Sequence, residues 1–180
     1  MRVVSGQYGG RTRKTLEGKN TRPTGDKVRA AIFSMLGQYF DGGLVLDLYS
    51  GSGGLAIEAI SRGYDRAIMV EKDRQAQQVI QANIDMTKDN DRFTMMKMTS
   101  DKAISLLNEP FDLVFLDPPY AKEQIVKDIE KLEGNGLLSP CVTIVCETDK
   151  SVDLPASIVN FSLIKHKTYG ISKVSLYERS

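Results

Sequence analysis

The chain has 180 residues, of which 41% are hydrophobic and 26% charged, and its formal net charge is +1. This size and composition suit one ordinary globular domain with room for a small extension. No apolar run approaches the roughly 20 residues that a membrane helix needs, and the first residues lack the apolar core of a signal peptide. With two cysteines, Cys141 and Cys146, the sequence predicts a reduced, cytoplasmic protein without a membrane partner.

Charge is distributed unevenly along the chain. Residues 1–40 contain eight Lys/Arg and two Asp/Glu, which gives a net charge of +6. Residues 41–180 contain sixteen Lys/Arg and twenty-one Asp/Glu, which gives a net charge of −5. Clustered positive charge favours contact with nucleic-acid phosphates, although a basic terminus can also be a solvated tail. We therefore expect a small basic N-terminal extension over 1–40 and a main domain over 41–180. The candidate nucleic-acid contacts are Arg11, Arg13, Lys14, Lys19 and Arg22.

A helix is predicted to begin near Asp26 and to stop at Asp41-Gly42-Gly43, and apolar strands then alternate with amphipathic helices. Strands are expected over 44–49, 67–71, 93–98, 111–117 and 141–147, and helices over 55–62, 73–87, 101–108 and 122–133. Residues 157–167 and 171–177 alternate around Tyr169-Gly170 and predict a closing hairpin. The sequence therefore predicts an α/β fold with a mostly parallel, seven-stranded sheet, covered on both faces and carrying an antiparallel edge hairpin.

A glycine-rich turn, Ser50-Gly51-Ser52-Gly53-Gly54, connects the strand over 44–49 to the next helix. Glycines in such a turn let a ligand approach the main-chain N–H groups at the helix N-terminus. Glu71 lies twenty residues beyond Gly51, at the end of the following strand, where a carboxylate can accept hydrogen bonds from both ribose hydroxyls of an adenosine. These features predict a nucleoside cofactor, and they fit both a nicotinamide dinucleotide and S-adenosylmethionine.

Asp47 favours the second of these cofactors. It lies inside an apolar strand, four residues before Gly51, where a carboxylate is costly unless it is hydrogen-bonded or paired. The carboxylate can accept from a backbone amide or from the ammonium group of a methionine moiety, and it would repel a pyrophosphate. We therefore expect S-adenosylmethionine as the cofactor, with Tyr49 as a wall of its pocket.

The motif Asp117-Pro118-Pro119-Tyr120 follows the strand over 111–117 and is the most specific feature of the sequence. Ligands of open α/β sheets bind beyond the carboxyl ends of strands, so the motif should lie beside the glycine turn. The prolines donate no N–H and leave the Pro118 carbonyl and the Asp117 carboxylate as adjacent acceptors. Two acceptors can orient an exocyclic amino group for attack on a methyl sulfonium, and Tyr120 can stack on a flipped-out base. All four residues are predicted to be catalytic.

These residues are also compatible with several other functions. An adenine-N6 methyltransferase would use a similar motif, but 180 residues leave little room for a DNA-recognition domain. Protein-glutamine methyltransferases carry Asn at the position of Asp117. A non-catalytic RNA-binding protein would not need both motifs, and a nicotinamide oxidoreductase conflicts with Asp47. No Cys, His and carboxylate set has the spacing of metal ligands, so no metal is expected.

Together the motifs resemble those of class I (Rossmann-like) amino-methyltransferases, and further segments narrow the resemblance to the RsmD family of bacterial 16S rRNA guanine-N2 methyltransferases. The segments that carry it are Val45-Leu46-Asp47-Leu48-Tyr49-Ser50-Gly51-Ser52-Gly53, Glu71-Lys72-Asp73, Asp117-Pro118-Pro119-Tyr120, Arg2-Val3-Val4-Ser5-Gly6, Thr21-Arg22-Pro23-Thr24, Val28-Arg29-x-x-Ile32-Phe33 and Tyr169-Gly170. The resemblance covers nearly the whole chain. It implies methyl transfer from S-adenosylmethionine to the 2-amino group of the guanine at position 966 of 16S rRNA, within a partly assembled small ribosomal subunit.

The resemblance also assigns cofactor contacts by position. It implies that Asp47, Gly51 and Gly53 hold the methionine end, that Glu71 holds the ribose, and that Asp101 reads the adenine amino group. Lys102 departs from the family pattern, which has a small residue there, and this puts the Asp101 contact in doubt. The basic extension would contact the RNA, and we expect a monomer. The full set of expected cofactor contacts is Asp47, Tyr49, Gly51, Gly53, Glu71, Lys72, Asp101 and Asp117.

Overall fold

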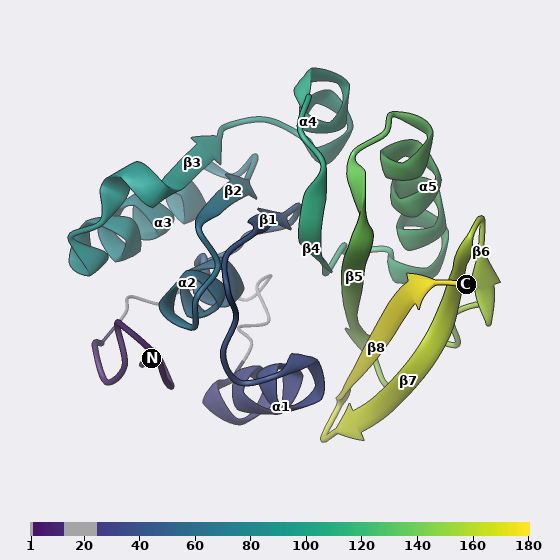
Figure 1. The fold of residues 1–180 in the computed structure, drawn as a ribbon, viewed down its shortest axis with the longest axis horizontal. Helices are drawn as coiled ribbons and strands as arrows, with labels where there is room; N and C mark the ends of the chain where they lie inside the picture. Colours follow the sequence, from purple (N-terminus) through teal and green to yellow (C-terminus); the bar gives the residue numbers. More distant parts are fainter. Residues whose placement is uncertain (1, 13–24) are drawn as a thin grey trace.

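The computed structural model describes residues 2–12 and 25–180 and contains an eight-stranded sheet of order β3-β2-β1-β4-β5-β8-β7-β6 (Figure 1). Strands β1 to β5 are parallel, and β8, β7 and β6 extend one side of the sheet as antiparallel strands. The strands are β1 (Leu44–Asp47), β2 (Arg66–Val70), β3 (Phe93–Met96), β4 (Phe111–Leu116), β5 (Leu138–Asp149), β6 (Ser157–Ile158), β7 (Phe161–Tyr169) and β8 (Ser172–Arg179).

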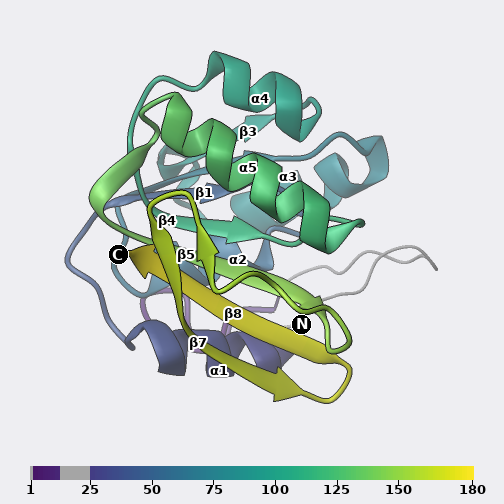
Figure 2. The same ribbon diagram turned by 90° about the vertical axis from the view of Figure 1, so that its right-hand side faces the viewer.

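Helices cover both faces of the sheet, and each face has its own apolar core. The helices are α1 (Asp26–Leu36), α2 (Gly54–Ser61), α3 (Arg74–Thr87), α4 (Ser100–Leu106) and α5 (Ala121–Gly134), with a 3₁₀ turn over Asn90–Arg92. Helices α1, α2 and α3 contribute to one core and α4 and α5 to the other, so that α1 and α5 lie on opposite sides of the sheet (Figure 2). All four residues of β1 are buried, as expected for a parallel strand covered on both faces.

The predicted α/β architecture is confirmed, but the sheet has eight strands rather than seven. The single strand expected over 157–167 is divided into β6 and β7 by a tight turn at Val159 and Asn160, so that Ile158 pairs with Phe161. Val159 has φ 50°, which is uncommon for a β-branched residue. Two-residue hairpin turns usually carry glycine, and the absence of glycine here hid the turn from the sequence pattern.

The first helix ends earlier than predicted. It was expected to reach Asp41-Gly42-Gly43, yet α1 stops at Leu36 and is followed by Gly37 with φ 126°. Residue Phe40 then packs its ring against Tyr64, with 4.6 Å between ring centroids, and its amide donates to the carbonyl of Arg62 over 2.8 Å. Tertiary packing of Phe40 therefore replaces the last predicted turn of helix.

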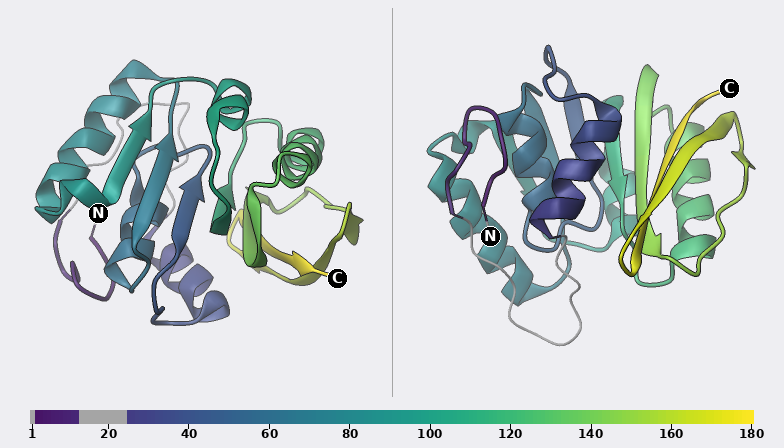
Figure 3. Two further views of the ribbon diagram at one scale, coloured as in Figure 1. Left: turned by 45° about the horizontal axis from the view of Figure 1, so that its top comes forward. Right: turned by 90° about the horizontal axis from the view of Figure 1, so that it is seen from below.

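Residues 2–12 lie against the α2 side of the sheet and share its core. Val3 and Tyr8 are each only 1% exposed, and an isolated bridge joins Arg2 to Thr12. The segment lies near α1 and α2 in the view from below (Figure 3, right). These residues pack with the main domain. The predicted role of residues 1–40 as an extension that contacts RNA stays a prediction.

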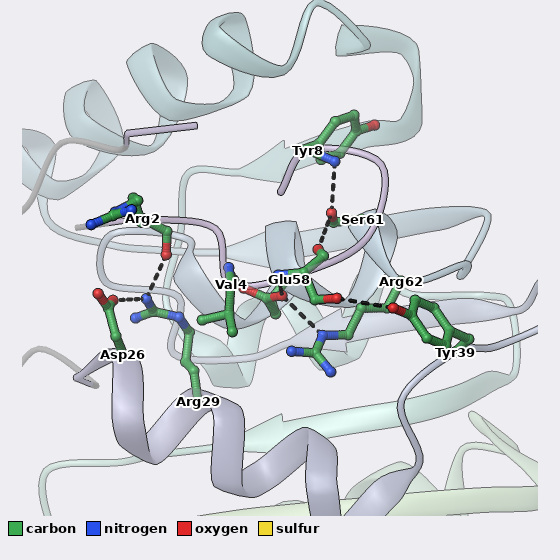
Figure 4. A network of polar contacts seen from close by, with 10 residues as sticks. Arg2, Val4, Tyr8, Asp26, Arg29, Tyr39, Glu58, Ser61 and Arg62 are labelled. Atoms are coloured by element: carbon green, nitrogen blue, oxygen red, sulfur yellow. Dashed lines mark hydrogen bonds and ion pairs between the residues drawn. The ribbon is translucent and has the colours of Figure 1, made fainter. Parts of the chain in front are cut away.

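A buried carboxylate on α2 holds this N-terminal segment in place (Figure 4). Glu58 is fully buried, and its Oε1 accepts a hydrogen bond of 2.7 Å from the Val4 amide. Its Oε2 accepts from the Ser5 amide at 3.0 Å and from Nε of Arg62 at 2.9 Å. Both oxygens are therefore used, and the buried charge is paired with a guanidinium that is itself 4% exposed.

Ser61, one turn after Glu58, completes the attachment. Its hydroxyl donates to the Ser5 carbonyl over 2.6 Å and accepts from the Tyr8 amide at 2.8 Å. Gly6 sits between these contacts with φ 85°, and a Cβ there would lie 2.0 Å from the Ser61 carbonyl oxygen. Only glycine lets the segment approach α2 this closely.

We predict that Glu58→Gln destabilises the protein by about 3 kcal/mol, because it leaves a buried guanidinium unpaired and turns an amide group towards a backbone donor. Urea unfolding monitored by circular dichroism measures the effect. The matched control is Glu109→Gln, which breaks the exposed pair with Arg66 and should cost less than about 1 kcal/mol. Equal losses in the two variants would contradict the anchoring role of Glu58.

Candidate active site

A cavity of about 510 Å³ opens at the carboxyl ends of the parallel strands. The strand order places β1 between β2 and β4, so successive crossovers run to opposite sides of β1. Open α/β sheets bind ligands in the crevice at such a switch point. The volume lies within the range typical of small-molecule sites. Its wall is formed by Leu48, Tyr49, Gly51, Val70, Glu71, Lys72, Met98, Thr99, Ser100, Asp117, Pro118, Pro119, Ala121, Thr148, Asp149 and Val152.

The glycine turn between β1 and α2 reaches the cavity through Gly51, whereas Gly53 lies outside the lining. Gly53 caps α2 with φ 83°, and a Cβ there would lie 2.5 Å from the Met69 side chain. Gly51, with φ 60°, has open space at its Cβ position and lines the cavity. From α3, Nδ2 of Asn83 donates to the Ser52 carbonyl over 2.8 Å and holds the turn against the sheet.

Glu71 lies directly across from this turn, as predicted from its place at the end of β2. Its Oε1 accepts from the Gly51 amide at 2.9 Å, and its Oε2 accepts from the Asp73 amide at 3.0 Å. Glu71 and Lys72 both line the cavity. The acidic partner and the glycine turn, twenty residues apart in sequence, are therefore in direct contact.

Asp47 lies at the end of β1, 3% exposed and outside the cavity lining. Burial raises the pKa of its carboxyl to about 7, while a hydrogen bond from Ser50 lowers the pKa and the charge of Glu71 raises it further. The Ser50 hydroxyl donates to Oδ2 of Asp47 over 3.2 Å. A carboxylate in this position gains from a cationic group brought close to it.

Tyr49 forms part of the wall, as expected, and a buried carboxylate fixes it. Its hydroxyl donates to Oδ2 of Asp128 over 2.5 Å, and Gln124 donates to the other oxygen over 2.9 Å. Asp128 is fully buried on α5, and burial raises the pKa of its carboxyl. Asp128 was not among the residues predicted from the sequence. Its position among the apolar residues of α5 is the signal that could have revealed it.

The Asp-Pro-Pro-Tyr motif lies at the same edge as the glycine turn. Asp117, Pro118 and Pro119 line the cavity beyond the end of β4. Tyr120 is not part of the lining; its side chain is 85% exposed, immediately before α5. An exposed aromatic ring beside the cavity is available for stacking on a base.

The far wall, beyond the Asp-Pro-Pro-Tyr motif, comes from the end of β5 and the turn after it. Thr148, Asp149 and Val152 form this wall, and the sequence analysis did not single them out. Their place at the carboxyl end of a parallel strand could have suggested them. They bound the part of the cavity that adjoins Asp117.

Asp101 is placed differently from the other expected contacts. It is outside the cavity lining, 64% exposed, and its Oδ1 accepts from Nζ of Lys131 at 3.0 Å. Met98, Thr99 and Ser100 line the cavity on this side instead. The adenine contact of Asp101 therefore stays a prediction.

Of the five expected RNA contacts, the structure describes Arg11. Its guanidinium donates to the carbonyl of Thr87 over 2.8 Å at the end of α3, and it lies 5.4 Å from the centre of the Tyr8 ring. The other four, Arg13, Lys14, Lys19 and Arg22, lie outside the described residues. Arg11 thus has a structural partner in the protein, and its contact with RNA stays a prediction.

Residues 2–12 and 25–180 show neither a metal-binding cluster nor a membrane-spanning helix. No group of three or more His, Cys, Asp or Glu side chains there could hold a metal ion. None of the helices in these ranges has the length and apolar character needed to traverse a bilayer. Both cysteines are free thiols, Cys141 exposed and Cys146 buried.

Comparisons with known proteins identify relatives along the full length. A family model described as "Conserved hypothetical protein 95" matches residues 1–178. The chain is 36% identical to "Putative rRNA methyltransferase YlbH" of Bacillus subtilis, with 99% of both chains covered. It is 31% identical to "Ribosomal RNA small subunit methyltransferase D" of Escherichia coli, covering 99% of this chain and 90% of the relative.

A solved structure of a conserved hypothetical protein from Streptococcus pyogenes superimposes with a TM-score of 0.82. The two chains are 59% identical, and the match covers 85% of this chain and 96% of the other. The family model, the sequence relatives and the solved structure each match most of the chain. The chain therefore belongs to the family described as conserved hypothetical protein 95, the RsmD family, and has its class I methyltransferase fold.

Proposed function

We propose that this protein transfers a methyl group from S-adenosylmethionine to the exocyclic N2 amino group of a guanine in 16S rRNA. The observation that carries the proposal is one cavity with the Glu71 carboxylate and the glycine turn at one end and Asp117-Pro118-Pro119 at the other. The names of both relatives support rRNA as the substrate, and that of the Escherichia coli relative supports small-subunit rRNA. The guanine at position 966 is the target that the family resemblance implies.

The cavity suits the cofactor in size and in the chemistry of its walls. Glu71 already accepts from two backbone amides and offers acceptor oxygens on the side of the cavity where the ribose would lie. Asp47, beneath the glycine turn, gains from a neighbouring cation because burial disfavours its charged form. We assign the methionine end to Asp47, Gly51 and Gly53, with Tyr49 and Lys72 beside the nucleoside.

The cofactor supplies a methyl group on an activated sulfonium, so the protein has mainly to position the acceptor. The Asp117 carboxylate and the Pro118 carbonyl accept the two N–H bonds of the guanine amino group and aim its nitrogen into the cavity. Asp117 can then take the proton that the nitrogen releases as the new N–C bond forms. Pro119 keeps this backbone rigid, and Tyr120 stacks on the extruded base.

The proposal extends to the assembly state of the substrate, the compartment and the oligomeric state of the protein. We infer that the substrate is the partly assembled small ribosomal subunit and that the protein acts in the cytoplasm as a monomer. The two free thiols suit a reducing compartment. Residues 1–40, with their net charge of +6, would supply RNA contacts that orient the substrate without selecting the base.

In a strain that lacks this gene, we expect small-subunit rRNA to lose one N2-methylguanosine, measured by mass spectrometry of nuclease digests. The wild-type gene should restore the modification. The Asp117→Ala variant should not, because losing an acceptor aimed at the reacting nitrogen lowers turnover by roughly 10²- to 10³-fold. An unchanged digest in the deletion strain would reject the proposed function, and restoration at the wild-type rate by Asp117→Ala would reject the role of Asp117.

Cofactor affinity should fall at low pH because Asp47 must be ionised to pair with the methionine ammonium. With a pKa of about 7 in the free protein, lowering the pH from 7 to 6 should weaken binding about fivefold by proton linkage. Isothermal titration with S-adenosylhomocysteine between pH 5.5 and 7 measures the dependence. The Asp47→Asn variant should bind S-adenosylhomocysteine more weakly, and its affinity should no longer depend on pH. The same dependence in Asp47→Asn would show that another group titrates.

Replacing Tyr120 with alanine should raise the KM for RNA through a loss of about 1–3 kcal/mol of stacking and leave cofactor affinity unchanged. Steady-state methylation of unmodified RNA and calorimetry give the two values. Leu106→Ala is the control, since Leu106 is also exposed, at 56%, but lies at the end of α4, outside the cavity lining and outside residues 1–40. If both variants had the same KM as wild type, Tyr120 would not contact the base.

A further inference from the structure

The β7–β8 hairpin has a charge pattern unlike that of the rest of the main domain. Residues 154–177 contain no Asp or Glu, although residues 41–180 as a whole carry a net charge of −5. Within this stretch lie Lys165, His166 and Lys167, consecutive exposed residues of β7. The stretch is thus a positive region on an acidic domain.

Strand pairing places two of these lysines on one face. Lys165 pairs with Leu176 and Lys167 with Val174, and both partners belong to the core on the α1 side. Cross-strand partners point to the same face of a sheet, so the two lysines lie on the α1 side, about 7 Å apart along the strand. The register shift between Leu163 and Lys165 sets this alignment. In the view from below, the N-terminal segment, α1 and the hairpin follow one another across the molecule (Figure 3, right).

The turn of the hairpin is fixed at the rim of the cavity. Ser172, at the start of β8, pairs with Asp149, which lines the cavity. The amide of Lys150 donates to the Ile171 carbonyl over 2.9 Å and adds a third lysine beside the turn. The Tyr169 hydroxyl contacts Met35 of α1 at 3.9 Å. The basic face of the hairpin is therefore held rigidly next to the site.

These positive charges are not neutralised within the part of the chain that the structure describes. Lys150, Lys165 and Lys167 are exposed and form no ion pair among residues 2–12 and 25–180, and the Lys167 ammonium lies 5.6 Å from the centre of the Tyr169 ring. Lys173 differs, because it is 13% exposed and donates to the Val152 carbonyl at 2.9 Å, near Asp153. Lys173 thus supports the cavity wall, and the other three point to solvent.

We propose that Lys150, Lys165 and Lys167 form a phosphate-contact surface that holds the RNA strand adjoining the nucleotide in the cavity. The inference rests on the proposed function, because it takes the nucleotide at Asp117 to be part of an RNA chain. Lysines on an exposed strand can also serve only to prevent edge-to-edge association. If the lysines had only that role, replacing them would alter self-association of the protein and leave its RNA binding unchanged.

The test compares the salt dependence of RNA binding in wild type and in K165A/K167A, with unmodified 16S rRNA made by transcription as the probe. Loss of two phosphate contacts should reduce the slope of log K against log salt by about 1.4, at about 0.7 for each contact to a single strand. The KM for RNA should rise, while kcat and the affinity for S-adenosylhomocysteine stay unchanged. K165R/K167R should restore the wild-type slope.

The control K102A/K127A removes the same charge from α4 and α5 on the opposite face and should leave the slope close to that of wild type. An equal slope for K165A/K167A and wild type, with wild type active, would overturn the hairpin surface and leave the proposed function intact. A fall in kcat or in cofactor affinity would also overturn it. A wild-type protein that methylates no RNA would reject the proposed function, and the hairpin inference with it.

Discussion

The buried carboxylate of Glu58 accepts from the backbone of Val4 and Ser5 and from Arg62, and the position of α2 depends on these bonds. The guanidinium of Arg62 lies 4.8 Å from the centre of the Phe33 ring, so α1 is joined to the same cluster. Helix α2 begins at Gly54, the last residue of the glycine turn, directly after Gly53. One short helix therefore has the glycine turn at its start and the attachment of the N-terminal segment near its end.

Charge divides the molecule by function in the arrangement that we propose. Carboxylates stand at the ends of three adjacent strands, and they suit a cationic cofactor and an amino group that donates hydrogen bonds. Asp47 is the last residue of β1, Glu71 follows β2 and Asp117 follows β4. Lys72 is the one positive side chain in the described lining of the cavity, and other positive side chains lie outside it, on the N-terminal segment and the β7–β8 hairpin. A polyanion would thus be attracted to the rim while the acidic interior admits only its uncharged base.

Local patterns predicted the parallel half of the sheet well, because short apolar strands and amphipathic helices each bury a face that periodicity reveals. They failed where long-range packing decides the outcome, as in the early end of α1 beside Phe40 and the turn at Val159. The site followed the same rule. Gly51, Glu71 and Asp117 line one cavity, in keeping with their places beside strand ends, and what they bind stays a prediction. The pattern of α5 marks Asp128 as buried, but its partner Tyr49 lies 79 residues away in sequence, and only the tertiary fold shows that the two meet.

The bond between Tyr49 and Asp128 joins two parts of the cavity. Tyr49 follows β1 beside the glycine turn, and Asp128 lies on α5, the helix that begins directly after Tyr120. A ligand that displaces the Tyr49 ring must either break this hydrogen bond or move α5 with the ring, and a ligand that moves α5 faces the same choice at Tyr49. Thermodynamic reciprocity then requires that the two ligands change each other's affinity by the same factor, so the order in which they enter affects the path of binding but not its final free energy.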